Sequence, residues 1–193
     1  MLARHLACLV GVSGLLAPIC ASTASAYDFE DMVNGGRPTT GYYAASPVPR
    51  TTVNYPENQR PGTIVISTKE RRLYLVTGNG QAIRYGIGVG RDGFSWSGVK
   101  TVTAKKEWPG WTPPEQMLRR RPDLPRFMKG GPDNPLGARA MYLGSTLYRI
   151  HGSNEPETIG QAVSSGCFRL TNEDVIDLYS RVKVGATVIV RQQ

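Results

Sequence analysis

Cysteine and histidine are scarce in this chain of 193 residues, which contains three cysteines and two histidines. Cys8, Cys20 and His5 all fall within the first 26 residues, so Cys167 and His151 are unique in the remainder. A lone cysteine cannot close an intramolecular disulfide. It packs as a small apolar residue, pairs with another chain or acts as a reactive thiolate. We expect no disulfide framework, no metal site and no cofactor.

The apolar run near the start of the chain is too short to cross a bilayer as a stable helix. It extends from Leu6 to Ile19 and is followed by Ala24-Ser25-Ala26, the small-residue pattern at which signal peptidase cleaves. We therefore expect residues 1–26 to be a cleaved signal peptide, and the protein to be exported to the periplasm or cell envelope.

Acidic residues are outnumbered, because 23 Lys and Arg face 15 Asp and Glu, which gives a net charge of +8. Such a surface suits an anionic partner, for example a cell-wall polymer. No basic run interleaved with aromatic residues occurs apart from Arg119-Arg120-Arg121. Together with the expected export, this argues against nucleic acid as a partner.

A helix is missing where a nucleotide site would require one. Gly88, Gly90 and Gly93 have the spacing of a dinucleotide fingerprint, but the residues that follow, from Phe94 to Ala104, predict a strand. A phosphate-binding turn needs the N-terminus of a helix. The glycines indicate instead a bulge or a close backbone approach near a cleft.

The segment from Tyr27 to Pro61 has few periodic apolar residues and many Pro, Gly, Thr, Asn and Tyr. It cannot bury enough apolar surface to fold alone. We expect residues 27–62 to be a disordered linker, either a plain leader or a tether that lets the domain reach its substrate. Residues 63–193 are expected to form a single catalytic domain.

The pattern of the expected domain is mainly β with one clear helix. Thr63 to Thr68 is β-branched, and two more strand patterns follow around an Asn79-Gly80 turn, which predicts an antiparallel meander. Apolar spacing predicts one amphipathic helix from about Asn172 to Val182, with Thr171 as its N-cap. Further strands are predicted at residues 94–104, 140–143, 147–150 and 187–190. The fold class is a mixed β-sandwich or half-open barrel.

A loop with seven prolines interrupts these strands between Lys106 and Gly137, with one helical turn expected from Met117 to Arg121. A loop of this length in a compact domain is typical of a lid or binding loop. Trp108 and Trp111 either line a substrate cleft or form a small core of the loop itself.

The unique thiol and the unique imidazole lie sixteen residues apart in sequence. A free thiol has a pKa near about 8.5, and an imidazole within hydrogen-bond reach can take its proton to form an ion pair. Gly166 would let its own N–H group and that of Cys167 point at a developing oxyanion. Arg169 suits a substrate carboxylate, or else it anchors the turn to backbone carbonyls.

These residues resemble the signature of the L,D-transpeptidases of the YkuD type. His151-Gly152-Ser153 matches their HG(T/S) motif, and Ser164-Ser165-Gly166-Cys167-Phe168-Arg169 matches S-x-G-C-x-R. Asn134-Pro135-Leu136-Gly137 extends the match upstream. Ser165 stands where many members carry a second histidine.

The resemblance implies that Cys167 attacks a peptidoglycan stem tetrapeptide, releases D-alanine and holds a thioester. An amine, commonly that of a neighbouring diaminopimelate, would resolve it as a 3→3 crosslink. His151 would be the base, oriented by a carbonyl such as that of Gly152. The resemblance also implies substrate-binding roles for Arg169, Ser165, Ser164 and Ser153, and inhibition by carbapenems.

Four other outcomes stay open at this stage. Water in place of the amine would make the protein an L,D-carboxypeptidase or endopeptidase. An envelope protein could supply the acceptor amine, which would attach that protein to peptidoglycan. A sortase has the same order of His, Cys and Arg but at wider spacing, and a wall-binding module without activity could keep the fold.

Overall fold

The computed structural model describes residues 44–192 of the chain. The predicted signal peptide, residues 1–26, lies outside them. Within the described range, no helix has the length and apolar character needed to cross a membrane.

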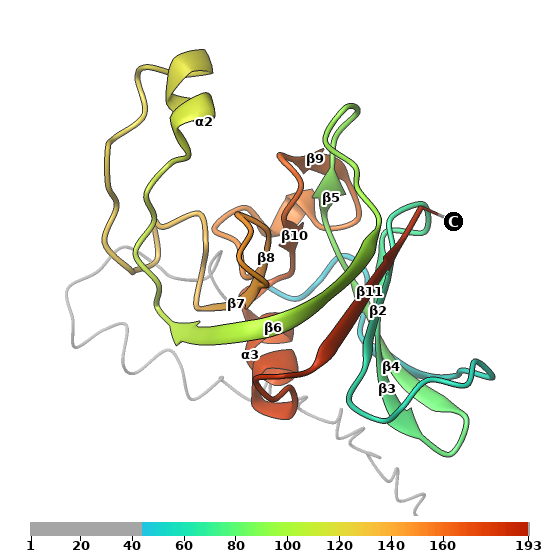
Figure 1. Ribbon diagram of the computed structural model, residues 1–193. Helices are drawn as coiled ribbons and strands as arrows, with labels where there is room; N and C mark the ends of the chain where they lie inside the picture. The colour runs from blue at the N-terminus through green and yellow to red at the C-terminus, as the bar shows by residue number, and fades with distance from the viewer. Residues whose placement is uncertain (1–43, 193) are drawn as a thin grey trace, which may run out of the picture. The chain divides into compact units, whose positions relative to one another are not determined.

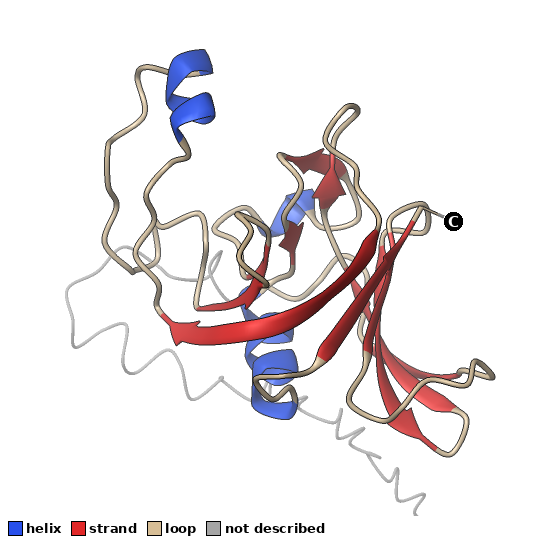
Figure 2. Cartoon of the chain, viewed as in Figure 1, coloured by secondary structure: helices blue, strands red, loops and turns tan. Residues whose placement is uncertain are grey.

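Eleven strands and three helical segments make up this part of the chain (Figures 1 and 2). The helices are α2 (Glu115–Arg120), a 3-10 turn η2 (Pro156–Thr158) and α3 (Asn172–Arg181). The strands are β1 (Thr51–Asn54), β2 (Ile64–Ser67), β3 (Arg72–Gly78), β4 (Gln81–Gly86), β5 (Val89–Gly90), β6 (Gly98–Glu107), β7 (Arg139–Leu143), β8 (Arg149–His151), β9 (Ala162–Ser164), β10 (Phe168–Arg169) and β11 (Thr187–Arg191).

Nine of the strands form one curled sheet in the order β1-β4-β3-β2-β11-β6-β7-β8-β10, while β5 and β9 pair with each other. The long strand β6 joins the two halves, because its first residues pair with β11 and its later ones with β7 (Figure 1). The register shifts between Val102 and Ala104, and such a bulge bends a strand. The prediction of a mainly β, half-open barrel with one clear helix is confirmed.

Alternation along the central strands gives the sheet two apolar faces. In β2, Ile64 and Ile66 are fully buried in the main core, whereas Val65 belongs to a smaller cluster on the opposite face. The predicted turn between β3 and β4 is present, with positive φ angles of 53° at Asn79 and 69° at Gly80, which suits a tight hairpin.

The predicted amphipathic helix is present as α3, which packs against β7. The Thr171 hydroxyl accepts a hydrogen bond from the Asp174 N–H at 3.2 Å, so the predicted N-cap is confirmed. Val175 and Leu178 bury the apolar face of the helix in the main core. This helix begins three residues after Arg169 and thereby fixes the end of the segment that carries Cys167.

The linker prediction for residues 27–62 is wrong in the part that the structure describes. Thr51–Asn54 form the edge strand β1 against β4, and Tyr55 is buried in the smaller apolar cluster. A β ladder at a sheet edge uses backbone groups, so it needs no apolar periodicity in the added strand. The folded unit therefore starts upstream of residue 63.

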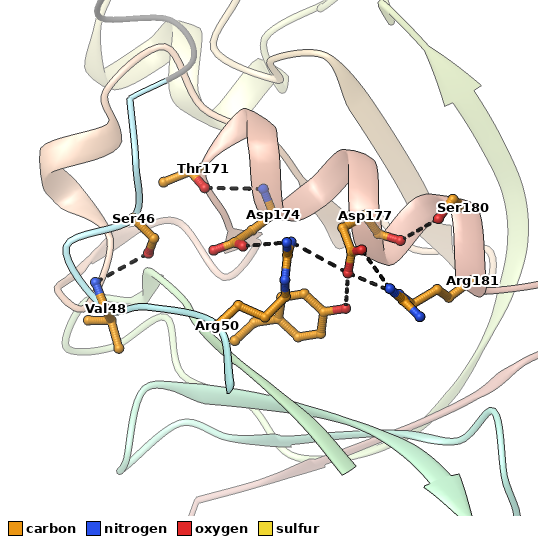
Figure 3. A network of polar contacts seen from close by, with 9 residues as sticks. Ser46, Val48, Arg50, Thr171, Asp174, Asp177, Ser180 and Arg181 are labelled. Carbon is orange, nitrogen blue, oxygen red and sulfur yellow. Dashed lines mark hydrogen bonds and ion pairs between the residues drawn. The ribbon is translucent and has the colours of Figure 1, made fainter. Parts of the chain in front are cut away.

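Ion pairs also attach this upstream segment to α3 (Figure 3). Nη1 of Arg50 lies 3.1 Å from Asp174 Oδ1 and 3.5 Å from Asp177 Oδ2. The Asp177 carboxylate accepts three further hydrogen bonds, at 2.6 Å from the Tyr85 hydroxyl and at 3.0 and 2.9 Å from Nε and Nη2 of Arg181. The network joins the N-terminal segment, β4 and α3.

Two predicted element boundaries differ from the structure, and the interpretation of the glycines agrees with it. The strand predicted at residues 94–104 starts at Gly98, and the helical turn predicted at Met117 starts at Glu115. The glycine interpretation is confirmed, because a Cβ on Gly90 would lie 2.6 Å from the Phe94 carbonyl oxygen, and no helix follows before β6 in the described structure.

Candidate active site

The parallel pair β8 and β10 brings His151 and Cys167 together. Register pairs Phe168 with Ile150 and Arg169 with His151, and the Leu170 N–H donates to the His151 carbonyl at 2.9 Å. Cys167 stands immediately before β10, and the continued register places it beside Arg149, two residues before His151. Alternate residues of a strand point to one face, so Cys167 and His151 share a face of the strand pair. Both side chains line one cavity of about 400 Å³.

The imidazole of His151 is held in a single orientation. Its Nδ1 lies 2.6 Å from the Gly152 carbonyl oxygen, and the side chain is buried with 4% exposure. A carbonyl only accepts, so Nδ1 carries the proton and Nε2 keeps the lone pair. The expected orienting role of the Gly152 carbonyl agrees with this contact. Burial first, and then the charge of Arg169, lowers the pKa of His151 to about 3.

The side-chain amide of Asn172 secures the turn that contains Gly152. Its Nδ2 donates to the Ser153 carbonyl at 2.9 Å, and its Oδ1 accepts from the Ala138 N–H at 2.8 Å. A Cβ on Gly152 would lie 2.2 Å from that Oδ1. Asn172 was not predicted as a site residue, although its place as the first residue of the predicted helix was visible in the sequence.

The Cys167 thiol has a hydrogen-bond partner beside the cavity. Its Sγ donates to the Leu147 carbonyl at 3.6 Å. Burial raises the pKa of Cys167, against the lowering effect of the Arg149 backbone hydrogen bond and of the charges on Arg149 and Arg169. Burial thus disfavours the charged form of both the thiol and the imidazole. The expected thiolate–imidazolium pair stays a prediction.

Hydrogen bonds from Ser164 shape the turn before the thiol. Its hydroxyl accepts from the Gly166 N–H at 3.1 Å and donates to the Cys167 carbonyl at 2.6 Å. The Gly166 N–H is therefore engaged in this conformation, and the oxyanion role expected for it stays a prediction. Ser164 lines the cavity, although both hydrogen bonds of its hydroxyl go to the turn, and the substrate-binding role expected for it stays a prediction. Of the two predicted oxyanion donors, the Cys167 N–H is the one that has no hydrogen-bond acceptor within residues 44–192.

Gly166 is nonetheless required at its position. Its φ is +104°, and a Cβ would lie 2.7 Å from Cε1 of Tyr148. Trp96 braces the same residue, because its Nε1 donates to the Gly166 carbonyl at 2.8 Å and its ring stacks on Tyr148 at 4.5 Å. Nothing in the sequence distinguished Trp96, which contacts this turn from 70 residues away.

The other two serines of the motif have different surroundings. Ser153 has 1% exposure, and its hydroxyl accepts from the Glu155 N–H at 2.9 Å. It does not line the cavity, so the structure gives no support to the substrate-binding role expected for Ser153, which stays a prediction. Ser165 is half-buried and does line the cavity, as a substrate-binding residue would.

Arg169 combines parts of its two expected roles. Its backbone anchors the segment through paired hydrogen bonds with Gly88, at 2.9 and 3.0 Å. Its guanidinium lines the cavity and forms an ion pair with Glu155 at 3.0 Å, rather than a bond to a backbone carbonyl.

The cavity is lined by both apolar and cationic side chains. The proline-rich loop contributes to both, through Trp111, Met117 and Arg120, which supports its expected role as a binding loop. Trp108 does not line the cavity. Within residues 44–192 the lining includes three arginines and no aspartate or glutamate. The apolar lining residues are Phe94, Trp111, Pro114, Met117, Pro135, Leu136 and Leu147, and the arginines are Arg120, Arg149 and Arg169.

A thiol and an imidazole that line one cavity are the groups of a nucleophile and its base in an enzyme domain. Comparison with known proteins identifies the family of this domain. Residues 61–190 match the family model of the YkuD L,D-transpeptidase catalytic domain. The chain therefore belongs to the L,D-transpeptidase family, and the resemblance seen in its HG(T/S) and S-x-G-C-x-R motifs is confirmed.

Individual relatives agree with this assignment. The chain is 40% identical over 147 residues to "Probable L,D-transpeptidase ErfK/SrfK" of Escherichia coli K12, which covers 72% of this chain and 46% of that protein. The chain thus spans about half the length of the curated relatives it matches. An L,D-transpeptidase from Mycobacterium smegmatis shares the fold, with a TM-score of 0.54 at 19% identity over 67% of this chain and 58% of that one.

One similar crystal structure has a different name. It is a "Probable carnitine operon oxidoreductase" from Brucella melitensis, 45% identical, with a TM-score of 0.52 over 79% of this chain and 99% of that one. In the present chain the glycines that resemble a dinucleotide fingerprint lead into strand β6 and not into a helix. Their geometry therefore gives no support to a dinucleotide site here.

Proposed function

We propose that this protein is a cysteine-dependent L,D-transpeptidase that acts on peptidoglycan stem peptides. One observation carries the proposal: Cys167 and His151 come from two paired strands and line one cavity, with the imidazole oriented so that Nε2 can take a proton. Family membership supplies the reaction class.

The first half-reaction forms a thioester. The proton of the Cys167 thiol moves to Nε2 of His151, and the sulfur attacks the carbonyl carbon on the L-centre of diaminopimelate. The Cys167 N–H donates to the oxyanion that develops. When this intermediate collapses, the carbon–nitrogen bond breaks, His151 returns its proton to the departing amine, and D-alanine leaves.

The second half-reaction transfers the acyl group. An amine loses a proton to His151 Nε2 and attacks the thioester carbonyl, after which the thiolate leaves and is reprotonated. The product is a new amide, a 3→3 crosslink when the amine belongs to a neighbouring diaminopimelate. One amide replaces another, so the exchange consumes no ATP and suits a site outside the cytoplasm.

The charges around the cavity support an anionic substrate. Three arginines line it without an acidic neighbour in the described lining, and stem peptides carry several carboxylates. Of the predicted substrate-binding residues, Arg169, Ser165 and Ser164 line it. We extend the proposal to export: residues 1–26 would be removed as a signal peptide, and the protein would act in the cell envelope.

Incubation with a carbapenem tests the nucleophile. We expect the peptide that contains Cys167 to gain the mass of the intact inhibitor, and Cys167→Ala to abolish that gain. Peptide mapping separates Cys167 from Cys8 and Cys20. Adduct formation on the Cys167→Ala protein at the wild-type rate would contradict the proposal.

A donor tetrapeptide then separates transfer from hydrolysis. With a second stem peptide or an envelope protein as acceptor, transpeptidation gives a crosslinked product beside released D-alanine. Release of D-alanine with tripeptide as the sole other product would assign the protein to the hydrolases instead.

A further inference from the structure

Arg149 lies beside the thiol but outside the HG(T/S) and S-x-G-C-x-R motifs. It is the first residue of β8, two positions before His151, and its side chain lines the cavity. The register that pairs Phe168 with Ile150 places Cys167 next to Arg149 across the parallel strands.

Arg149 and Cys167 share one hydrogen-bond acceptor. The Leu147 carbonyl accepts from Arg149 Nη1 at 3.3 Å and from Cys167 Sγ at 3.6 Å. Two donors that meet at one oxygen lie close to each other, so the guanidinium is adjacent to the sulfur. The Arg149 plane also stands over the Tyr142 ring, with 5.1 Å to its centroid.

One donor of this guanidinium is unused in the resting structure. The Nε of Arg149 is buried and has no hydrogen-bond partner among the described residues. A buried donor without an acceptor costs free energy, and a new anion beside it would supply the acceptor.

The resting contact of the thiol cannot survive ionisation. A protonated sulfur donates to the Leu147 carbonyl, but a thiolate has no proton to donate and is repelled by that oxygen. A donor must then replace the carbonyl as the partner of the sulfur, and the adjacent guanidinium is the one that already contacts the same oxygen.

We propose that Arg149 is a catalytic residue that holds the Cys167 thiolate. When the thiol proton passes to His151 Nε2, the guanidinium donates to the sulfur, which balances its negative charge until the sulfur bonds to the substrate carbonyl. The inference rests on the proposed function, in which Cys167 is the nucleophile.

The other charged groups near the sulfur are engaged elsewhere, so Arg149 is the group available to pair with the thiolate. On β10, Arg169 is already paired with Glu155 at 3.0 Å. On α2, Arg120 stands over the Phe94 ring at 5.4 Å. Arg149 has no carboxylate within ion-pair distance in the described part of the chain, and His151 receives the proton.

The test is the pH dependence of Cys167 alkylation by iodoacetamide, followed on the full chain by peptide mapping. In Arg149→Gln we expect the midpoint to rise by about one pH unit, which makes alkylation at pH 7 roughly tenfold slower. Arg149→Lys keeps the charge but not the planar donors, so its midpoint should rise by less. Arg84→Gln is the matched control, because Arg84 also has a buried Nε without a partner but lies on β4, outside the cavity.

Donor kinetics give a second readout. The kcat for D-alanine release by Arg149→Gln should fall roughly tenfold at pH 7 and recover at higher pH, with KM nearly unchanged. A merely structural role would not move the alkylation midpoint, and a substrate-binding role would raise KM.

An alkylation midpoint in Arg149→Gln equal to that of wild type would overturn the role of Arg149. If Arg149→Gln fails to fold, as judged by near-ultraviolet circular dichroism, an unshifted midpoint in Arg149→Lys would overturn it. Neither result affects the nucleophile, which fails separately if Cys167→Ala still releases D-alanine.

Discussion

Nδ1 of His151 lies 2.6 Å from the carbonyl oxygen of Gly152, its own chain neighbour. This one contact sets the tautomer of the ring, because a carbonyl can only accept a hydrogen bond. It leaves Nε2 as the base. A backbone carbonyl here takes the orienting place that a carboxylate has in many nucleophile–base pairs.

Gly152→Ala should disrupt this orientation. The added Cβ would approach Asn172 Oδ1 to 2.2 Å, so the carbonyl that holds the imidazole must move. We expect kcat for D-alanine release to fall by about 100-fold, as expected when a catalytic base is misplaced. Gly62→Ala is the comparison, because its φ of +86° strains the backbone as well, but a Cβ there meets no atom within 4 Å and the residue does not line the cavity. Equal kcat values for Gly152→Ala and wild type would refute the orienting role.

Asn172→Ala should destabilise the fold around the site. The substitution leaves the buried Ala138 N–H without its acceptor, and the Ser153 carbonyl loses a donor. Two such losses correspond to about 2 to 4 kcal/mol in the free energy of unfolding, measured with urea. Asn154→Ala, which removes a single exposed bond of 3.3 Å to the Asp133 carbonyl, should cost less than about 0.5 kcal/mol. Similar losses for the two variants would contradict the bracing role of Asn172.

The buried neutral histidine should make stability depend on pH. Because the pKa of His151 is lowered to about 3, the unfolded chain binds a proton on this residue below about pH 6.5, whereas the folded chain binds it only near pH 3. The contribution of neutral His151 to the free energy of unfolding is therefore fully present above about pH 6.5 and is lost as the pH falls toward 3. The loss between pH 7 and 5 is roughly 2 kcal/mol. Urea unfolding of wild type and His151→Asn at both pH values measures this. A wild-type decrease no larger than that of the variant would contradict the lowered pKa.

Arg50→Gln should weaken the attachment of the N-terminal segment to α3. Burial raises the pKa of Asp174, and the Arg50 charge opposes that rise, so removal of Arg50 leaves a buried carboxylate less well compensated. We expect a loss of about 1 to 2 kcal/mol in the free energy of unfolding. Arg121→Gln is the control, since its ion pair with Asp123 is exposed and such pairs contribute little. An Arg50→Gln effect as small as that of the control would contradict the network in Figure 3.

Local patterns explain which parts of this structure were predictable. The β-branched run of β2, the Asn79-Gly80 turn and the Thr171 cap act over a few residues, so each is legible in sequence. The pair of Cys167 and His151 was predictable because each residue is unique after residue 26. The family motif added what spacing alone could not.

Contacts between distant segments explain what was missed. The hydrogen bond from Trp96 to Gly166, the use of the Gly166 N–H by Ser164 and the edge pairing of β1 depend on how the folded chain brings these groups together. Arg149 was missed for the same reason, because its proximity to Cys167 follows from the register of β8 and β10.

The most direct measurement of the central claim is trapping of the covalent intermediate. The protein is mixed with a stem tetrapeptide, quenched in acid within the first turnover and mapped by mass spectrometry. We predict that the Cys167 peptide gains the mass of the tetrapeptide less that of the released D-alanine, as a thioester requires, and that Cys167→Ala shows no gain. Steady release of D-alanine by wild type together with undiminished release by Cys167→Ala would contradict the account.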